Sequence, residues 1–218
     1  MSEAKIPFRH IAVEGPIGVG KTSLVQLLAD RFEGVMVLED ITNPFLPSFY
    51  EGRAGAAFQV QIYFLLSRFQ QQREIAQMNL FQRLVLADYS FPKDRIFAYL
   101  NLDDTDLRVY EKLYPVLEAE VAKPDLVIYM QASIPVLLER IAGRARDFER
   151  DIDPAYLERL IEAYSYYFFH YRETPLLVVN TDDIDFVNNQ ADLDALVEQV
   201  LRSHRGTQVY VPVSSQKP

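Results

Sequence analysis

The sequence predicts an α/β fold in which a five-stranded parallel sheet is flanked by helices. Five short apolar segments alternate with longer segments of helical periodicity, the order typical of a parallel sheet with helical crossovers. The first apolar segment also leads directly into a glycine-rich turn and then into an apolar helix start. The length of 218 residues suits one domain with its own core. We therefore expect a single domain over residues 1–205, followed by a C-terminal tail at 206–218.

The glycine-rich turn follows the pattern G-x-x-x-x-G-K-[ST], the phosphate-binding P-loop. Its glycines allow consecutive backbone N–H groups to turn toward an anion, and the following helix adds the positive end of its dipole. Lys21 is placed to reach the β- and γ-phosphates, and the Thr22 hydroxyl to hold Mg²⁺. We therefore predict that the chain binds a nucleoside triphosphate. The predicted contacts are Gly15, Pro16, Ile17, Gly18, Val19, Gly20, Lys21, Thr22 and Ser23.

The next two elements place carboxylates at the end of a strand. A helix is expected over residues 24–32, and the apolar residues 35–38 predict the second strand. Glu39 and Asp40 directly follow this strand. In open parallel sheets, ligands bind beyond the carboxyl ends of the strands. A carboxylate there is either a solvated cap or part of a ligand site, and its position leaves both open.

A long helix follows an irregular segment. Prolines and glycines make residues 41–55 an expected loop, and residues 56–79 then place apolar side chains at a helical period. Gln61 and Arg68 lie seven positions apart and therefore share one face of this helix. They are either solvated or directed into a cleft, and the spacing does not decide between these.

The third predicted strand, residues 84–87, ends at Asp88. An apolar strand that ends in a carboxylate is the Walker-B arrangement, which beside a P-loop supplies a second anchor for Mg²⁺. Two helices are expected after it, over residues 94–101 and from about 103 to 122.

The fourth strand is expected at residues 126–130, and the helix after it carries Arg140 and Arg144. Arg146 and Arg150 follow soon afterwards. Arginines this dense form either a salt-bridged surface or a mobile lid whose guanidinium groups close on a triphosphate. Because a P-loop is present, we favour the lid.

Residues 154–171 predict a long helix that is dense in aromatic side chains near its end. Tyr166, Phe168 and Phe169 exceed what one apolar face can bury, which indicates a subunit interface and a homodimer. The positions expected to face the core are Tyr156, Leu160, Tyr164, Tyr167 and Tyr171.

The remaining elements are a fifth strand at residues 176–179 and a last helix at 192–203. The tail from Gly206 shows no pattern that predicts structure, and the chain contains no internal repeats.

The composition excludes several classes of function. A formal net charge of −9 argues against a nucleic-acid partner, because binding to a phosphate backbone needs a basic surface. The chain has no cysteine, so disulfides and thiolate chemistry are excluded and a zinc site is not expected. No apolar run approaches the length of about 20 residues that spans a bilayer, and the N-terminus has no apolar segment of secretory type. We therefore expect a cytoplasmic protein without a membrane partner.

Several separated segments together form a pattern that is much more specific than a P-loop alone. They are Gly15 to Ser23, Phe49-Tyr50-Glu51, Gln61 with Ser67-Arg68, Asp94-Arg95-Ile96-Phe97-Ala98, and Gln131-Ala132-Ser133 leading into Arg140, Arg144, Arg146, Glu149 and Tyr156. In these segments the chain resembles the deoxyribonucleoside kinases of the deoxycytidine, deoxyguanosine and deoxyadenosine kinase branch, and bacterial purine deoxynucleoside kinases in particular. The resemblance covers roughly residues 8–186.

The resemblance implies a P-loop kinase fold with an arginine-rich lid, and ATP as phosphoryl donor to the 5′-hydroxyl of a 2′-deoxynucleoside. It implies that Glu39 takes the proton from this hydroxyl and that Tyr50 and Glu149 hold the sugar 3′-hydroxyl. Mg²⁺ would be bound with the help of Thr22 and Asp88. The cations implied to act in catalysis are Lys21, Arg140, Arg144 and Arg146, with Arg144 also contacting ATP.

Base recognition is implied for three further residues. Gln61 would read the near edge of the base, while Arg68 and Asp94 would complete its recognition from the far edge. A carboxylate can accept from the amino group of adenine or cytosine, and a guanidinium can donate to the carbonyl of guanine. We therefore expect a purine deoxynucleoside or deoxycytidine to be favoured over thymidine.

One position departs from the family pattern. The family usually has Glu-Arg-Ser or Asp-Arg-Ser after the third strand, whereas this chain has Asp88-Tyr89-Ser90. The missing arginine normally lies near the 5′-oxygen, and a tyrosine carries no charge at neutral pH. The substitution therefore bears on the turnover rate or on the acceptor, and a lid arginine is one candidate to compensate.

Two alternative functions compete with this hypothesis. A nucleoside monophosphate kinase of thymidylate kinase type has a similar sheet, P-loop and lid, but it needs basic residues for the acceptor phosphate, and residues 41–52 contain none before Arg53. A kinase-like subunit that binds nucleotide without turnover conflicts with the intact Lys21 and Glu39, although Tyr89 keeps it open.

Overall fold

The computed structural model describes residues 6–79, 84–144 and 152–212. A parallel sheet of six strands lies at the centre, with the strand order β2-β3-β1-β4-β5-β6. The expected α/β fold with a parallel sheet is thereby confirmed. The strands are β1 (His10–Glu14), β2 (Val35–Val37), β3 (Val85–Ala87), β4 (Leu126–Gln131), β5 (Leu176–Asn180) and β6 (Thr207–Tyr210).

The sixth strand lies where the sequence predicted only a tail. β6 pairs in parallel with β5, with Thr207 opposite Leu176 and Tyr210 opposite Val179. Because β6 is the edge strand, Val209 remains 68% exposed and the segment needs no continuous apolar run. A short, half-exposed strand of this kind leaves little periodicity in the sequence, which explains why five strands were expected.

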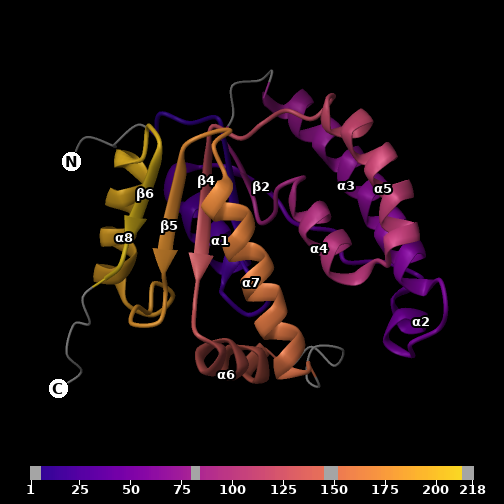
Figure 1. Ribbon diagram of the computed structural model, residues 1–218. Helices are drawn as coiled ribbons and strands as arrows, with labels where there is room; N and C mark the ends of the chain where they lie inside the picture. The colour runs from indigo at the N-terminus through magenta and orange to yellow at the C-terminus, as the bar shows by residue number, and fades with distance from the viewer. Residues whose placement is uncertain (1–5, 80–83, 145–151, 213–218) are drawn as a thin grey trace.

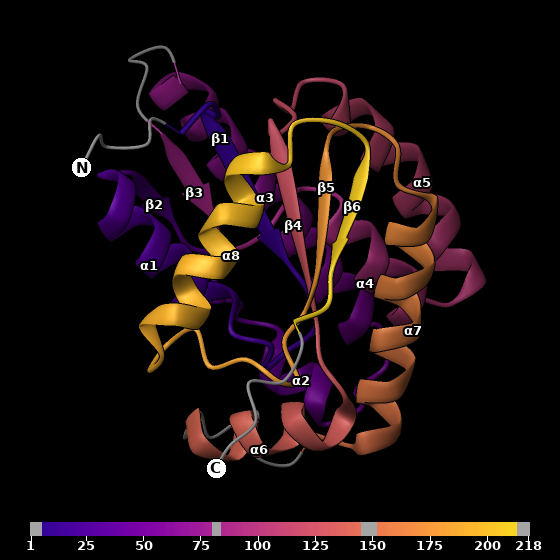
Figure 2. The ribbon, with the colours of Figure 1, turned by 90° about the vertical axis from the view of Figure 1, so that its left-hand side faces the viewer.

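Helices cover both faces of the sheet. Figure 2 shows α1 and α8 on one side of the strands and α4 and α7 on the other, while Figure 1 shows α3 and α5 outside α4. α6 crosses below the ends of the central strands in both views. The helices are α1 (Lys21–Phe32), α2 (Leu46–Tyr50), α3 (Ala56–Asn79), α4 (Lys93–Asn101), α5 (Asp104–Glu118), α6 (Ile134–Arg144), α7 (Pro154–His170) and α8 (Gln190–Arg202).

The face of α7 that packs on the sheet differs slightly from the predicted one. Tyr129 of β4 stacks on Phe168 with 4.3 Å between ring centroids, and Phe168 is only 4% exposed. Phe168 was expected outside the core and instead belongs to it, because the helix period carries it in line with Tyr164. Tyr166 and Phe169 do point outward, at 72% and 74% exposure.

A short helix, α2, lies within the segment that was expected to be an irregular loop. Among the described helices, none is both long enough and apolar enough to cross a membrane.

Candidate active site

The P-loop connects β1 to α1 and depends on its glycines. Gly15, Gly18 and Gly20 have φ angles of 148°, 84° and 102°, which side chains rarely allow. A Cβ atom at Gly15 would also lie 2.4 Å from the carbonyl oxygen of Met130. The loop can therefore turn its backbone around an anion only because these positions are glycine.

Lys21 is folded back onto this loop. Its Nζ atom donates hydrogen bonds to the carbonyl oxygens of Gly15 at 2.8 Å and Pro16 at 3.1 Å. Burial, together with repulsion from the ammonium group of Lys93, lowers the pKa of Lys21 to about 8, although attraction to Glu14, Glu39 and Asp88 acts in the opposite direction. A buried ammonium group is attracted more strongly to a phosphate oxygen than one in water, because the effective dielectric constant inside the protein is lower.

A cleft of about 1010 Å³ opens beside the P-loop. It lies between residues 18–23, α6 and the segment that follows β5, residues 182–189. A cleft of this size can hold a nucleotide. Arg140, which lines this cleft, donates to Thr181 Oγ1 at 2.9 Å, to the Thr181 carbonyl at 2.7 Å and to the Val19 carbonyl at 3.3 Å. Arg140 thus connects α6 to the P-loop in this structure.

The two residues predicted to hold Mg²⁺ lie side by side. The Thr22 hydroxyl donates to Asp88 Oδ2 at 2.7 Å, and Asp88 Oδ1 accepts the backbone N–H of Glu39 at the same distance. This contact follows from the sheet, because β3 lies between β1 and β2 and all three strands end at the same edge. Asp40, the other carboxylate after β2, accepts from the Thr42 N–H and is exposed, so it is the solvated cap.

Glu39 lies between two cations. Its Oε1 atom accepts from Arg68 Nη2 at 2.7 Å and from Nε at 3.1 Å, while Oε2 lies 2.5 Å from Lys93 Nζ. The Glu39 side chain is only 13% exposed. Burial raises the pKa of this carboxyl group, but attraction to Lys93 and Arg68 outweighs burial and brings the pKa down to about 2. Glu39 is therefore held as a carboxylate.

The three residues expected to recognise the base form one buried network. Asp94 accepts hydrogen bonds from Arg68, from Gln61 Nε2 at 2.7 Å and from the Tyr110 hydroxyl at 2.8 Å. Asp94 is fully buried, and Gln61 and Arg68 are 3% and 4% exposed. Gln61, Arg68 and fully buried Leu65 share the inner face of α3, so this helix buries polar groups as well as apolar ones. The spacing of Gln61 and Arg68 therefore marks a face directed into the protein.

The remaining predicted site residues are Tyr50, Arg144, Arg146 and Glu149. Tyr50, at the end of α2, is 59% exposed and has its ring against Phe49, with 5.5 Å between the centroids. Arg144 is the last residue of α6, and its side chain lies outside the description. Arg146 and Glu149 fall within residues 145–151, which are likewise outside the described residues. Their predicted contacts with phosphates and with the 3′-hydroxyl stay predictions.

The sequence reasoning missed Lys93, Tyr110 and Glu14. Glu14, at the end of β1, is fully buried and accepts from the backbone N–H of Ser90 at 2.5 Å and from its hydroxyl at 2.9 Å. Burial raises the pKa of Glu14 above its usual value. A signal was available for Lys93, since it directly precedes Asp94 in a family motif. Tyr110 lies in an ordinary helix and gave none.

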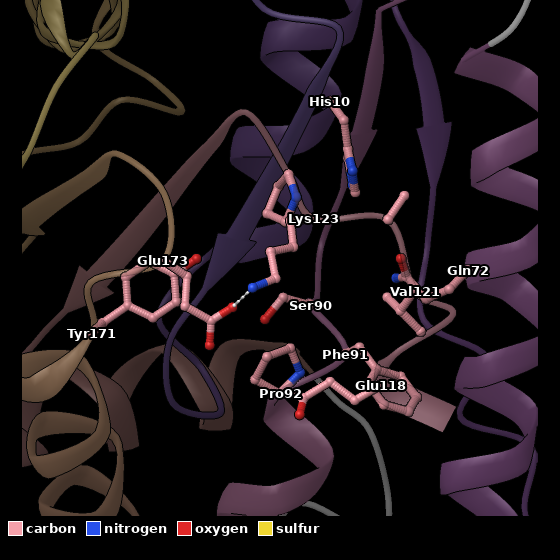
Figure 3. A pocket seen from close by; sticks show the side chains of 12 residues that line it. His10, Gln72, Ser90, Phe91, Pro92, Glu118, Val121, Lys123, Tyr171 and Glu173 are labelled. Carbon is pink, nitrogen blue, oxygen red and sulfur yellow. Dashed lines mark ion pairs between the residues drawn. The ribbon is translucent and has the colours of Figure 1, made fainter. Parts of the chain in front are cut away.

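A separate, smaller cavity of about 30 Å³ lies away from the P-loop (Figure 3). His10, Gln72 and Ser90 line it, with the 2.8 Å ion pair of Lys123 and Glu173 on one side. This volume holds a water molecule or two, so the cavity is too small for a nucleoside. His10 is buried there, and within the described part of the chain its ring nitrogens have no hydrogen-bond partner.

The fold and the site together define a P-loop protein that binds a nucleotide. A P-loop with its lysine and threonine lies next to a nucleotide-sized cleft, and a buried carboxylate with a polar network lies beyond the adjacent strands. The first part fits a phosphate-rich nucleotide, and the second a small polar acceptor.

Comparisons with known proteins identify the family. A model of the deoxynucleoside kinase family matches residues 11–204. Over 196 residues the chain is 37% identical to a deoxyguanosine kinase of Bacillus subtilis (strain 168), covering 87% of this chain and 95% of that protein. It is 30% identical over 210 residues to a deoxyadenosine/deoxycytidine kinase of the same organism, covering 92% and 95%. The chain belongs to the deoxynucleoside kinase family and not to the alternative thymidylate kinase type.

A solved structure agrees with this assignment. The deoxyadenosine kinase from M. mycoides with bound dCTP matches the fold with a TM-score of 0.74 and 25% sequence identity, covering 88% of this chain and 98% of that one. The protein is therefore a kinase enzyme that acts on nucleosides and nucleotides, and the hypothesis of a subunit without turnover is set aside.

Proposed function

We propose that the protein transfers the γ-phosphoryl group of ATP to the 5′-hydroxyl of a purine deoxynucleoside or deoxycytidine. The observation that carries this proposal is the continuous chain of contacts from the P-loop to the base-reading residues. Thr22 contacts Asp88, Asp88 contacts Glu39, and Glu39 contacts Arg68. A donor phosphate at the P-loop and an acceptor at Glu39 would therefore be neighbours.

The chemistry follows from this juxtaposition. The 5′-oxygen of the acceptor forms a bond to the γ-phosphorus while the bond from that phosphorus to the β–γ bridging oxygen breaks, which releases ADP. Glu39 accepts the proton of the 5′-hydroxyl. Phosphoryl transfer requires positioning and charge neutralisation more than covalent work by the protein. Lys21 supplies a cation on the donor side.

The pair of Thr22 and Asp88 supports a role for Mg²⁺. A hydroxyl and a carboxylate offer the oxygen ligands that Mg²⁺ prefers, and this ion usually takes only one or two protein ligands together with phosphate and water. Bound there, Mg²⁺ would neutralise charge on the β- and γ-phosphates.

The preference for the base is inferred from the network around Asp94. Arg68 and Asp94 offer a donor and an acceptor side by side, and Gln61 offers an amide. Thymine would bring a methyl group and a carbonyl against these charged groups and leave some of them unpaired. Each buried polar group that is left without a hydrogen-bond partner reduces the binding free energy by roughly 1–3 kcal/mol. The curated relatives named for deoxyguanosine and for deoxyadenosine and deoxycytidine agree with this preference.

A panel of acceptors tests the proposed function directly. ATP and Mg²⁺ would be incubated with each of the four deoxynucleosides and with their monophosphates, and the products separated by ion-exchange chromatography. We expect monophosphates from deoxyadenosine, deoxyguanosine or deoxycytidine, little from thymidine, and no diphosphates. A preference for thymidine or for a monophosphate would refute the proposal.

We also propose that the protein is a homodimer through α7. Tyr166 and Phe169 are exposed on this helix, and Tyr99 on the neighbouring α4 is 54% exposed. Sedimentation velocity should show a dimer that Phe169→Asp converts to a monomer. Val209→Asp, at a similarly exposed position on β6, is the matched control and should remain dimeric. A monomeric wild-type protein would refute the interface.

A further inference from the structure

Lys93 occupies a position that is unusual for a lysine. It is the first residue of α4 and is only 7% exposed, although lysine is rarely buried unless it is paired. Its Nζ atom lies 2.5 Å from Glu39 Oε2, and the ring of Phe97 lies 5.7 Å from the same atom. The side chain is thus directed inward, toward the carboxylate at the end of β2.

The two cations on Glu39 differ in what else they contact. Arg68 holds Oε1 and is at the same time paired with Asp94, so its charge is shared with a second carboxylate. Lys93 holds Oε2, and among the described residues Glu39 is its hydrogen-bond acceptor. An ammonium group has three N–H donors. Lys93 can therefore keep Glu39 in place and still donate to an oxygen of a ligand.

Lys93 also lies close to the donor side of the site. Lys93 contacts Glu39, the backbone N–H of Glu39 donates to Asp88, and Asp88 accepts from Thr22 directly after Lys21. In agreement with this chain of contacts, repulsion from Lys93 helps to lower the pKa of Lys21. An anion placed between the P-loop and Glu39 would be flanked by both. Cations aimed at the transferring phosphoryl group stabilise its developing charge.

The residue at position 89 explains why such a cation matters in this chain. Tyr89 follows Asp88 and is fully buried, and burial raises the pKa of its hydroxyl, so it remains neutral. Asp88, the residue before Tyr89, accepts the backbone N–H of Glu39 at 2.7 Å. Position 89 therefore lies next to a residue that contacts Glu39, the partner of Lys93, but it supplies no charge. Arg140 does not replace that charge in this structure, because its guanidinium is bound to Thr181 and Val19.

We propose that Lys93 is a positioning residue for phosphoryl transfer, which orients Glu39 toward the acceptor hydroxyl and supplies the positive charge that Tyr89 lacks. This inference rests on the proposed function, with Glu39 as the acceptor of the 5′-hydroxyl proton. Lys93 itself forms and breaks no covalent bond in the reaction.

The test moves the charge from one position to the other. Lys93→Met keeps an unbranched side chain, one atom shorter, but removes the charge, and we expect kcat to fall by about 10²-fold, as for loss of one preorganised donor, with KM for the deoxynucleoside changed far less. Tyr89→Arg combined with Lys93→Met should recover at least tenfold of that loss. Lys93→Arg, which keeps the charge in place, should be more active than Lys93→Met.

A matched control removes a different cation from the same helix. Arg95 pairs with Glu111 at the surface of α4, so Arg95→Met should leave kcat within about twofold of the wild type. Far-UV circular dichroism and thermal unfolding would establish that each variant is folded.

Three outcomes would overturn the proposal. These are a wild-type kcat in Lys93→Met, a loss confined to KM, and folded charge-bearing variants that are all as inactive as Lys93→Met. Failure of the proposed function is distinguishable from these, because it would appear in the wild-type protein as no transfer to any deoxynucleoside.

Discussion

The Thr22 hydroxyl donates a 2.7 Å hydrogen bond to Asp88 Oδ2, although 66 positions separate the two residues. This contact joins the first turn of α1 to the end of β3 and brings the two expected Mg²⁺ ligands together. We predict that Asp88→Asn raises the Mg²⁺ concentration needed for half-maximal activity by about 10- to 100-fold, in line with other changes around metal sites. Activity measured over a Mg²⁺ titration at saturating ATP would check this, and an unchanged midpoint would remove Asp88 from the metal site.

Glu39→Gln should remove the proton acceptor while keeping the shape of the side chain. Loss of a general base typically costs about 10²–10⁴-fold in rate, so kcat should collapse. Binding of the deoxynucleoside, measured by calorimetry without ATP, should change little. If binding were lost while kcat at saturation stayed normal, Glu39 would be an anchor for the substrate and not the base.

The double variant Arg68→Met with Asp94→Ala should relax the choice of base. The double variant removes the charged pair, whose hydrogen bonds a bound thymine cannot complete. The kcat/KM for thymidine should therefore rise relative to that for the purine deoxynucleosides. Competition assays on the wild type and the variant would measure this ratio. Because Gln61 and Tyr110 lose their shared acceptor, thermal unfolding must accompany the assay. A ratio that does not move in a folded variant would contradict the assignment.

His10 should make the stability depend on pH. Burial lowers the pKa of His10 to about 4, from 6.5, despite the opposing attraction of Asp125. Between these two pH values the unfolded chain binds more protons than the folded one, so the free energy of unfolding falls as the pH falls. From pH 7 to pH 5 this amounts to about 2 kcal/mol.

Urea unfolding of the wild type and of His10→Gln at both pH values would test this. The difference between the two proteins isolates His10, because Glu14, whose raised pKa acts in the opposite sense, is common to both. A difference in unfolding free energy that does not change with pH would show that His10 is not held neutral.

The sequence by itself determined the parts of the protein that are encoded by consecutive residues. The P-loop could be read from positions 15–23, because its function resides in a local backbone conformation that glycine permits. Glu39 and Asp88 could be placed at the edge of the sheet, because each ends an apolar strand and parallel strands end together. Segments of a family motif then pointed to Gln61, Arg68 and Asp94.

Only the tertiary structure decided which of these side chains meet. Lys93 reaches Glu39 because the turn after β3 directs the start of α4 toward the end of β2, a relation that spans 54 positions and leaves no periodic signal. The open question about Gln61 and Arg68 was settled in the same way, since helical spacing defines a shared face but not what covers it. β6 joins the sheet by backbone hydrogen bonds to β5, and backbone pairing at an exposed edge demands little of the side chains. Site residues that belong to a local motif could therefore be predicted from the sequence. The partners of buried charged residues could not, because they depend on how the sheet brings distant loops together.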